Sequence, residues 1–122
     1  MSMNIRVIAI AFLLGTLSAS AFAHHGWSTY TNTDFTLTGV VVDTRLGRPH
    51  DRLIVEAGGE QWNVVMSPPN RSQRAGFDDT VVKVGDTVTM LGNRHANPQT
   101  FEMKTRRINV HSKDYDLYPS RL

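Results

Sequence analysis

The sequence predicts an all-β fold in which five or six strands form a small antiparallel barrel. Segments rich in Thr, Val and aromatic residues recur from Asp34 onward, and turns containing Gly or Pro separate them. One short helix or turn interrupts the series. The chain contains no cysteine, so its core has to hold the fold without disulfides. Closing the sheet into a barrel also removes exposed strand edges.

The first three strands are expected in the segments DFTLTGVVVDTR, RLIVEA and QWNVVM. In the first, Phe35 and Leu37 alternate with threonines, and Gly39 indicates a bulge or a sharp bend. The second and third flank Gly58 and Gly59, which allow the positive φ of a hairpin turn. These segments therefore predict one bent strand followed by a hairpin.

A short helix or turn is expected in SPPNRSQRAGF, after the third strand. Ser67 suits the N-cap, Pro68 the first helical position, and Gly76 the C-terminus. Two further strands are expected in VKVGDTVTMLGN and TFEMKTRRINVH. Three strands, a helix and two strands is the order of the oligonucleotide/oligosaccharide-binding (OB) fold, with a β-sandwich as the alternative.

The N-terminal residues are typical of a cleaved secretory signal peptide. Arg6 precedes an apolar run, and an A-x-A signal ends at Ala23. Cleavage after Ala21 is the alternative, and the run is too short to span a bilayer stably. We therefore expect a periplasmic protein without a membrane span. Its expected parts are a signal peptide (1–23), an N-terminal arm (24–33), an OB-like barrel (34–111) and an irregular C-terminal tail (112–122).

Charge and motifs exclude several function classes. The chain has thirteen Lys and Arg residues and eleven Asp and Glu residues, and its sequence contains no basic stripe. Nucleic acid is therefore not an expected partner. No Gly-x-Ser-x-Gly motif supports serine catalysis, and enzymatic activity is not expected. The expected partner is a metal ion or an envelope protein, and the expected state is a monomer or a weak oligomer.

Histidines supply the candidate metal site, with copper as the expected cofactor. We select His24, His25, His50 and His95 as candidate ligands, while His111 ends the last expected strand. Cleavage after Ala23 would make His24 the N-terminal residue, with a free amine beside its imidazole. The amine and imidazole of His24, together with the imidazole of one more histidine, would form a three-nitrogen site that suits Cu(II). Cleavage after Ala21 would place His24 third from the amine, another copper-chelating terminus.

Three interpretations remain open. The first is a periplasmic Cu(II)-binding module acting as a chaperone, a buffer or a resistance accessory. The second is a metal-free ligand- or partner-binding barrel, accessory to an envelope complex. It predicts an exposed apolar or aromatic patch around Trp27, Phe77 or the tyrosines Tyr115 and Tyr118. The third is a copper enzyme, although so small a domain leaves little substrate surface.

Asp51 is a candidate to orient the imidazole of His50, unless an ion pair with Arg52 satisfies its carboxylate instead.

The chain resembles a family of short bacterial exported proteins of unknown function. The resemblance rests on His24-His25-Gly26 after the signal peptide, the strand TLTGVV, the turn Pro49-His50, Trp62, and the later strand VGDTVTMLG. It implies a small OB-like barrel in the periplasm and supplies no established activity. Arg48 stands where the family typically has asparagine.

Overall fold

The computed structural model describes residues 26–122 of the chain. The expected signal peptide and two candidate ligands, His24 and His25, lie outside the described residues. Among residues 26–122, no helix is both long enough and apolar enough to cross a membrane.

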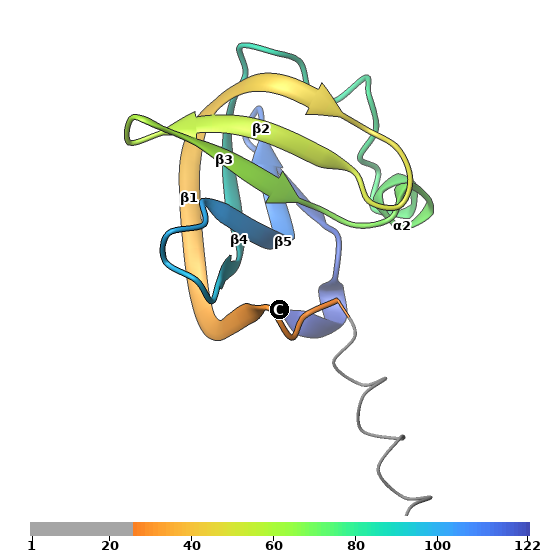
Figure 1. Cartoon of the computed structure of the whole chain (residues 1–122). Helices are drawn as coiled ribbons and strands as arrows, with labels where there is room; N and C mark the ends of the chain where they lie inside the picture. Colours follow the sequence, from red (N-terminus) through yellow and green to blue (C-terminus); the bar gives the residue numbers. More distant parts are fainter. Residues whose placement is uncertain (1–25) are drawn as a thin grey trace, which may run out of the picture.

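Six strands and two short helices make up this part of the chain (Figure 1). In chain order they are β1 (Tyr30–Arg45), β2 (Arg52–Ala57), β3 (Glu60–Val65), α2 (Pro69–Arg74), β4 (Thr87–His95), β5 (Glu102–Val110), β6 (Lys113–Asp116) and the 3-10 helix η1 (Pro119–Arg121). The sheet order is β3-β2-β1-β4-β5-β6, and β3 also pairs with β5. That last pairing closes the sheet into a barrel.

The connectivity is that of an OB-type barrel, which confirms the predicted fold class. All neighbouring strands are antiparallel except β3 and β5, which run parallel and pair Val65 with Lys104. The helix α2 lies between β3 and β4 in the chain, as the sequence predicts. The described chain therefore has one closed sheet around one core.

Strand β1 is long because it takes part in two sides of the barrel. Its residues up to Val40 pair with β4, and those from Val40 onward pair with β2. Gly39 lies where the two pairings meet, and an added Cβ there would lie 2.4 Å from the Glu56 carbonyl oxygen. The β-bulge falls slightly later, between Val41 and Asp43. Gly39 thus permits close approach at the bend.

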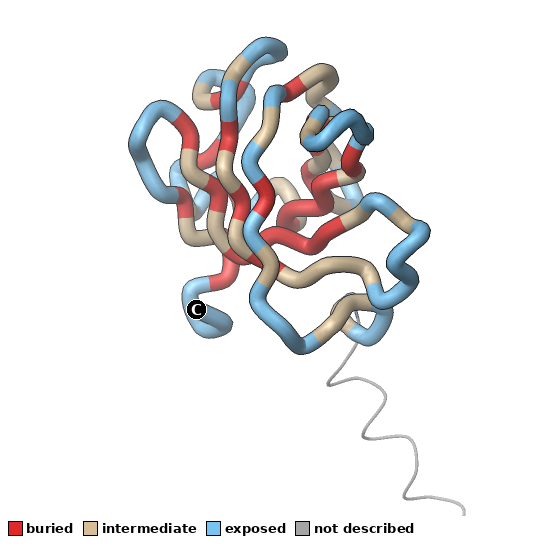
Figure 2. Tube along the Cα trace, turned by 90° about the vertical axis from the view of Figure 1, so that its left-hand side faces the viewer, coloured by how far each residue is buried: buried red, intermediate tan, exposed pale blue. Residues whose placement is uncertain are grey.

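The core lies inside the barrel, and buried positions alternate with exposed ones along several strands (Figure 2). Met66, Met90 and Met103 are fully buried, as is Phe77. These flexible side chains fill the core. Trp62 is also buried, stacked against Phe35 with ring centroids 5.4 Å apart.

The helix begins one residue later than the sequence predicts. Pro68 is the N-cap residue and Pro69 the first helical residue, and no side chain caps the N-terminus. Ser67 is buried, and its hydroxyl lies 2.7 Å from that of Ser72. Ser67 therefore links the start of the helix to its middle, and Gly76 follows the helix with φ +87°.

Both ends of the described chain contain more regular structure than the sequence predicts. Residues 30–33, expected in the arm, already belong to β1. The tail, expected to be irregular, forms β6 and η1, and it buries Tyr115, Leu117 and Tyr118. The tail is ordered because Tyr115 packs on Phe77 and the backbone N–H of Leu117 donates to the Arg106 carbonyl at 2.8 Å.

We expect Gly39→Ala to lower the free energy of unfolding by about 2–3 kcal/mol, because its methyl group would overlap the β2 backbone. Urea unfolding measures this loss. The matched control is Thr38→Ala at the exposed neighbouring position, which loses a hydroxyl contact to Thr89 and costs less than about 1 kcal/mol. Equal losses in the two variants would contradict the close-approach role of Gly39.

Candidate functional site

The N-terminal arm is attached to the barrel through a buried lysine of β5. Lys104 is only 4% exposed, and its Nζ donates to the Gly26 carbonyl at 2.8 Å. A hydrogen bond from an ammonium to a carbonyl is stronger than one between neutral groups. This contact therefore holds the first described residue of the chain on the barrel.

Two aromatic rings and a second cation surround this contact. The rings of Trp27 and Tyr118 meet edge to face with centroids 5.1 Å apart. Lys104 Nζ lies 4.8 Å from the Trp27 ring centroid, and the Arg121 guanidinium carbon lies 4.3 Å from it. We call Gly26, Trp27, Lys104, Tyr118 and Arg121 the arm anchor. It brings the arm against the C-terminal helix η1, as Figure 1 shows.

The Lys104 charge has no carboxylate partner among residues 26–122. Burial, and then the nearby charge of Arg121, lower the pKa of Lys104. The Gly26 carbonyl and the faces of the rings are therefore the groups that stabilise this ammonium. A buried cation without a counter-ion is unusual in a structural role, and it marks this region as a candidate site.

His50 belongs to the same region of the barrel. It lies in the loop between β1 and β2 and is half-buried. Burial lowers its pKa below the ordinary value of 6.5, the positive charges of Lys104 and Arg52 lower it further, and Asp51 opposes them. The imidazole is therefore neutral at neutral pH, which is the protonation state that binds a metal.

Asp51 does not have the orienting role considered for it. Its carboxylate accepts a hydrogen bond from the Gly47 backbone N–H at 2.8 Å, across the loop. Its backbone groups pair with Met66 and Ser67. Asp51 is 4% exposed, so this buried carboxylate stabilises the loop that carries His50.

The other two described histidines have local contacts of their own. His95 Nδ1 accepts a hydrogen bond from the Asn97 N–H at 3.0 Å, and its ring meets Tyr30 edge to face. His111 lies in a turn with φ +51°, and its Nε2 is 3.3 Å from Asp86 Oδ2. No group of three or more His, Cys, Asp or Glu able to hold a metal occurs within residues 26–122.

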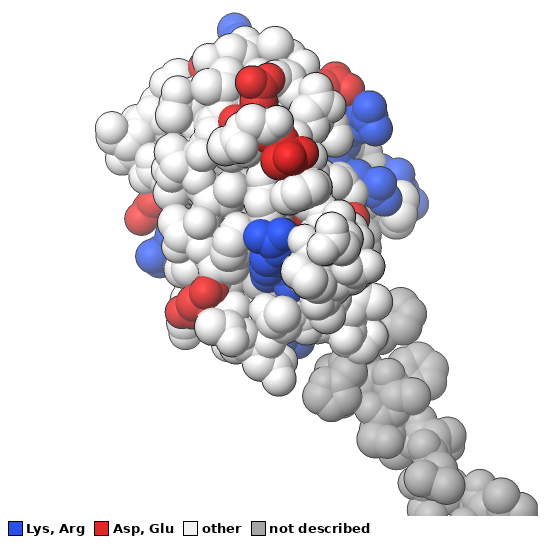
Figure 3. All heavy atoms as spheres, turned by 60° about the vertical axis from the view of Figure 1, so that its left-hand side comes forward, with Lys and Arg blue, Asp and Glu red and all other residues white. Residues whose placement is uncertain are grey.

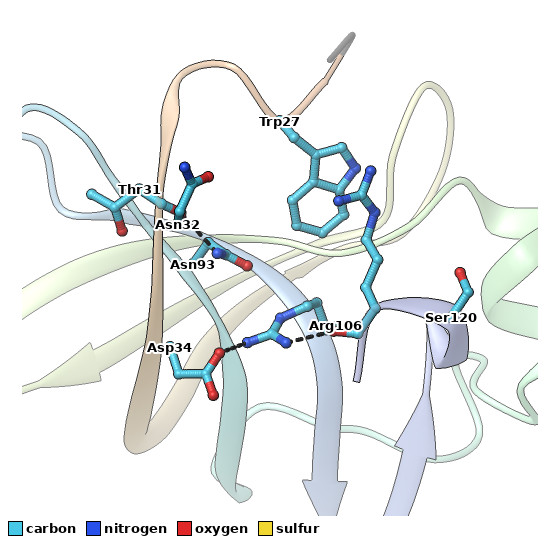
Figure 4. Close-up of a pocket in the computed structure, with 8 residues that line it drawn as sticks. Trp27, Thr31, Asn32, Asp34, Asn93, Arg106 and Ser120 are labelled. Atoms are coloured by element: carbon cyan, nitrogen blue, oxygen red, sulfur yellow. Dashed lines mark hydrogen bonds and ion pairs between the residues drawn. The ribbon is translucent and has the colours of Figure 1, made fainter. Parts of the chain in front are cut away.

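A polar pocket of about 370 Å³ lies beside the arm anchor (Figure 4). The arm, β1, β4, β5 and η1 all contribute to its lining, which comprises Trp27, Thr31, Asn32, Asp34, Asn93, Arg106, Ser120 and Arg121. Arg106 donates to Asp34 at 2.5 Å and to the Arg121 carbonyl at 2.6 Å. Sequence patterns did not indicate this pocket, because its residues come from segments far apart in the chain.

The predicted aromatic patch is not formed as expected. Phe77, Tyr115 and Tyr118 are buried, because they pack against one another or against Trp27. On the face in Figure 3, uncharged residues make up most of the surface, and acidic and basic groups lie next to each other near its edges.

Comparison with known proteins gives a family and a fold. A family of unknown function (DUF6152) matches residues 12–104. No curated protein matches the sequence. Among solved structures, the S. pombe Stn1-Ten1 complex matches with a TM-score of 0.51 and 15% identity, over 66% of this chain and 59% of that chain. The S. cerevisiae mitochondrial single-stranded DNA binding protein Rim1 matches with a TM-score of 0.47 and 11% identity, over 65% of this chain and 94% of that chain.

We expect Lys104→Met to release the arm while changing the free energy of unfolding by less than about 1.5 kcal/mol. The substitution loses the free energy of the hydrogen bond to Gly26, but it also removes the cost of burying an ammonium, and the two effects largely cancel. Release would be measured as increased acrylamide quenching of Trp27 fluorescence. The control is Lys113→Met, which removes an exposed ammonium 5.1 Å from the Tyr115 ring centroid. Equal quenching in the two variants would contradict the anchoring role.

The lowered pKa of His50 predicts a pH dependence of stability. Between its folded and unfolded pKa values, the unfolded chain binds more protons, so stability falls as the pH decreases below about 6.5. His50→Gln should therefore lose less stability than the unchanged protein between about pH 7 and pH 5. Urea unfolding at the two pH values measures the difference, with His111→Gln as the exposed control. A loss as large as in the unchanged protein would show that His50 does not contribute.

Proposed function

Because the chain belongs to DUF6152, a family of unknown function, its own residues have to indicate its activity, and we propose that it is a periplasmic Cu(II)-binding module. In this proposal the mature N-terminal His24 supplies its amine and imidazole, and His50 supplies the third nitrogen. The observation that carries the proposal is that one side chain, Lys104, acts on both parts: it binds Gly26 and its charge lowers the pKa of His50.

Only a short segment separates the proposed terminal ligand from the anchored residue Gly26. His24 precedes Gly26 by two residues, and two residues of extended chain span at most about 7 Å. A histidine side chain adds further reach. His25 is an additional ligand through its ring or its backbone amide. In the proposal, the anchored Gly26 carbonyl limits how far the terminal ligands can lie from the barrel surface.

The positive charges near His50 favour its neutral, metal-binding form but repel the copper ion itself. Burial, and then the charges of Lys104 and Arg52, lower the pKa of His50, so at neutral pH copper does not have to displace a proton from it. The same charges repel a divalent cation. Affinity therefore depends on the chelate formed by the amine and imidazole of one residue, which suits the tetragonal preference of Cu(II).

Export is part of the same proposal. Residues 1–23 have the pattern of a signal peptide with an A-x-A cleavage signal, and cleavage after Ala23 would create the free amine of His24. The absence of cysteine leaves nitrogen, oxygen and thioether groups as copper ligands. In the periplasm such a module would act as a chaperone, a buffer or a resistance accessory.

Cu(II) titration followed by electron paramagnetic resonance tests the proposal. The protein is processed to begin at His24, as mass spectrometry verifies, and the control carries one extra residue before His24. We expect one-to-one binding with nitrogen hyperfine structure in the processed form and at least tenfold weaker binding in the extended form. Equal affinity in the two forms would overturn the role of the N-terminal amine.

A further inference from the structure

We propose that the pocket beside Trp27 binds a small polyhydroxylated carboxylate, such as a sugar acid. Neither His50 nor His95 lines the pocket. Its volume of about 370 Å³ lies in the range of small-molecule sites. The proposal rests on three features: an excess of positive charge, a preoriented guanidinium and a set of neutral hydrogen-bonding side chains.

The lining of the pocket carries a net positive charge, which favours an anionic ligand. Arg106 and Arg121 contribute two guanidinium groups, whereas Asp34 contributes one carboxylate. Arg106 is 8% exposed and is held by Asp34 and by the Arg121 carbonyl, as the dashed lines in Figure 4 show. Asp34 compensates this buried cation, which leaves the charge of Arg121 without a carboxylate among the described residues. A ligand with one negative charge would balance the pocket.

Arg121 contributes a guanidinium to the pocket lining that can pair with a carboxylate. Its guanidinium carbon lies 4.3 Å from the centroid of the Trp27 ring. Stacking on an aromatic face leaves the in-plane N–H groups of a guanidinium free, and these match a carboxylate in a bidentate pair. Because Trp27 belongs to the arm anchor, it reduces the side-chain entropy that Arg121 would lose on binding.

The remaining polar side chains match hydroxyl groups. Thr31, Asn32, Asn93 and Ser120 line the pocket and are uncharged. Asn93 donates its amide to the Thr31 carbonyl at 2.8 Å, so its own side-chain oxygen remains an acceptor. The second oxygen of Asp34 is a further acceptor. Donors and acceptors placed around one cavity suit a ligand with several hydroxyls, each of which both donates and accepts.

The test uses the full mature protein labelled with ¹⁵N and follows its amide signals and the Trp27 indole signal by NMR. The protein is titrated with glucuronate, glucose and acetate. We expect saturable shifts around the pocket with glucuronate, and at least tenfold weaker binding of both glucose and acetate. The comparison is independent of copper, so failure of the copper proposal would leave its outcome unchanged.

Arg121→Gln should weaken glucuronate binding about tenfold, because it removes the bidentate partner. The matched control is Arg74→Gln, which replaces an exposed arginine of α2 outside the pocket and should bind as the unchanged protein does. The same spectra report whether each variant is folded. Three results would each overturn the proposal. They are the absence of shifts with glucuronate, binding of acetate or glucose as tight as that of glucuronate, and equal effects of the two substitutions.

Discussion

The ammonium of Lys104 is the constraint on which the described site depends. Its bond to Gly26 determines where the arm meets the barrel, and this in turn places Trp27 against Tyr118 and Arg121. The same charge helps to keep His50 neutral.

The barrel fixes Lys104 by close backbone packing. On one side β5 pairs with β3 at Val65, and this parallel contact closes the sheet. On the other side β5 pairs with β4, and Gly92 of β4 lies so close to β5 that an added Cβ would be 2.0 Å from the Lys104 carbonyl oxygen. A strand held this tightly leaves its side chain little freedom, so barrel closure and the attachment of the arm are linked.

The sequence predicts the fold better than it predicts the site. Alternation, turn glycines and the helix between the third and fourth strands lead to the OB-type barrel because these signals are local. Strand alternation does not reveal the burial of Lys104, because that burial arises from the arm and the tail, which cover it. The pocket around Arg106 likewise combines distant segments, which periodicity does not reveal. The exclusion of nucleic acid as a partner stays a prediction.

The central claim is that His50 and the N-terminal residue bind the same copper ion. Pulsed electron paramagnetic resonance of the Cu(II)-loaded mature protein tests it directly, because it detects the remote nitrogen of each bound imidazole. The account predicts that His50→Gln removes one imidazole coupling, while His111→Gln leaves the spectrum unchanged. A spectrum of His50→Gln identical to that of the unchanged protein would contradict it.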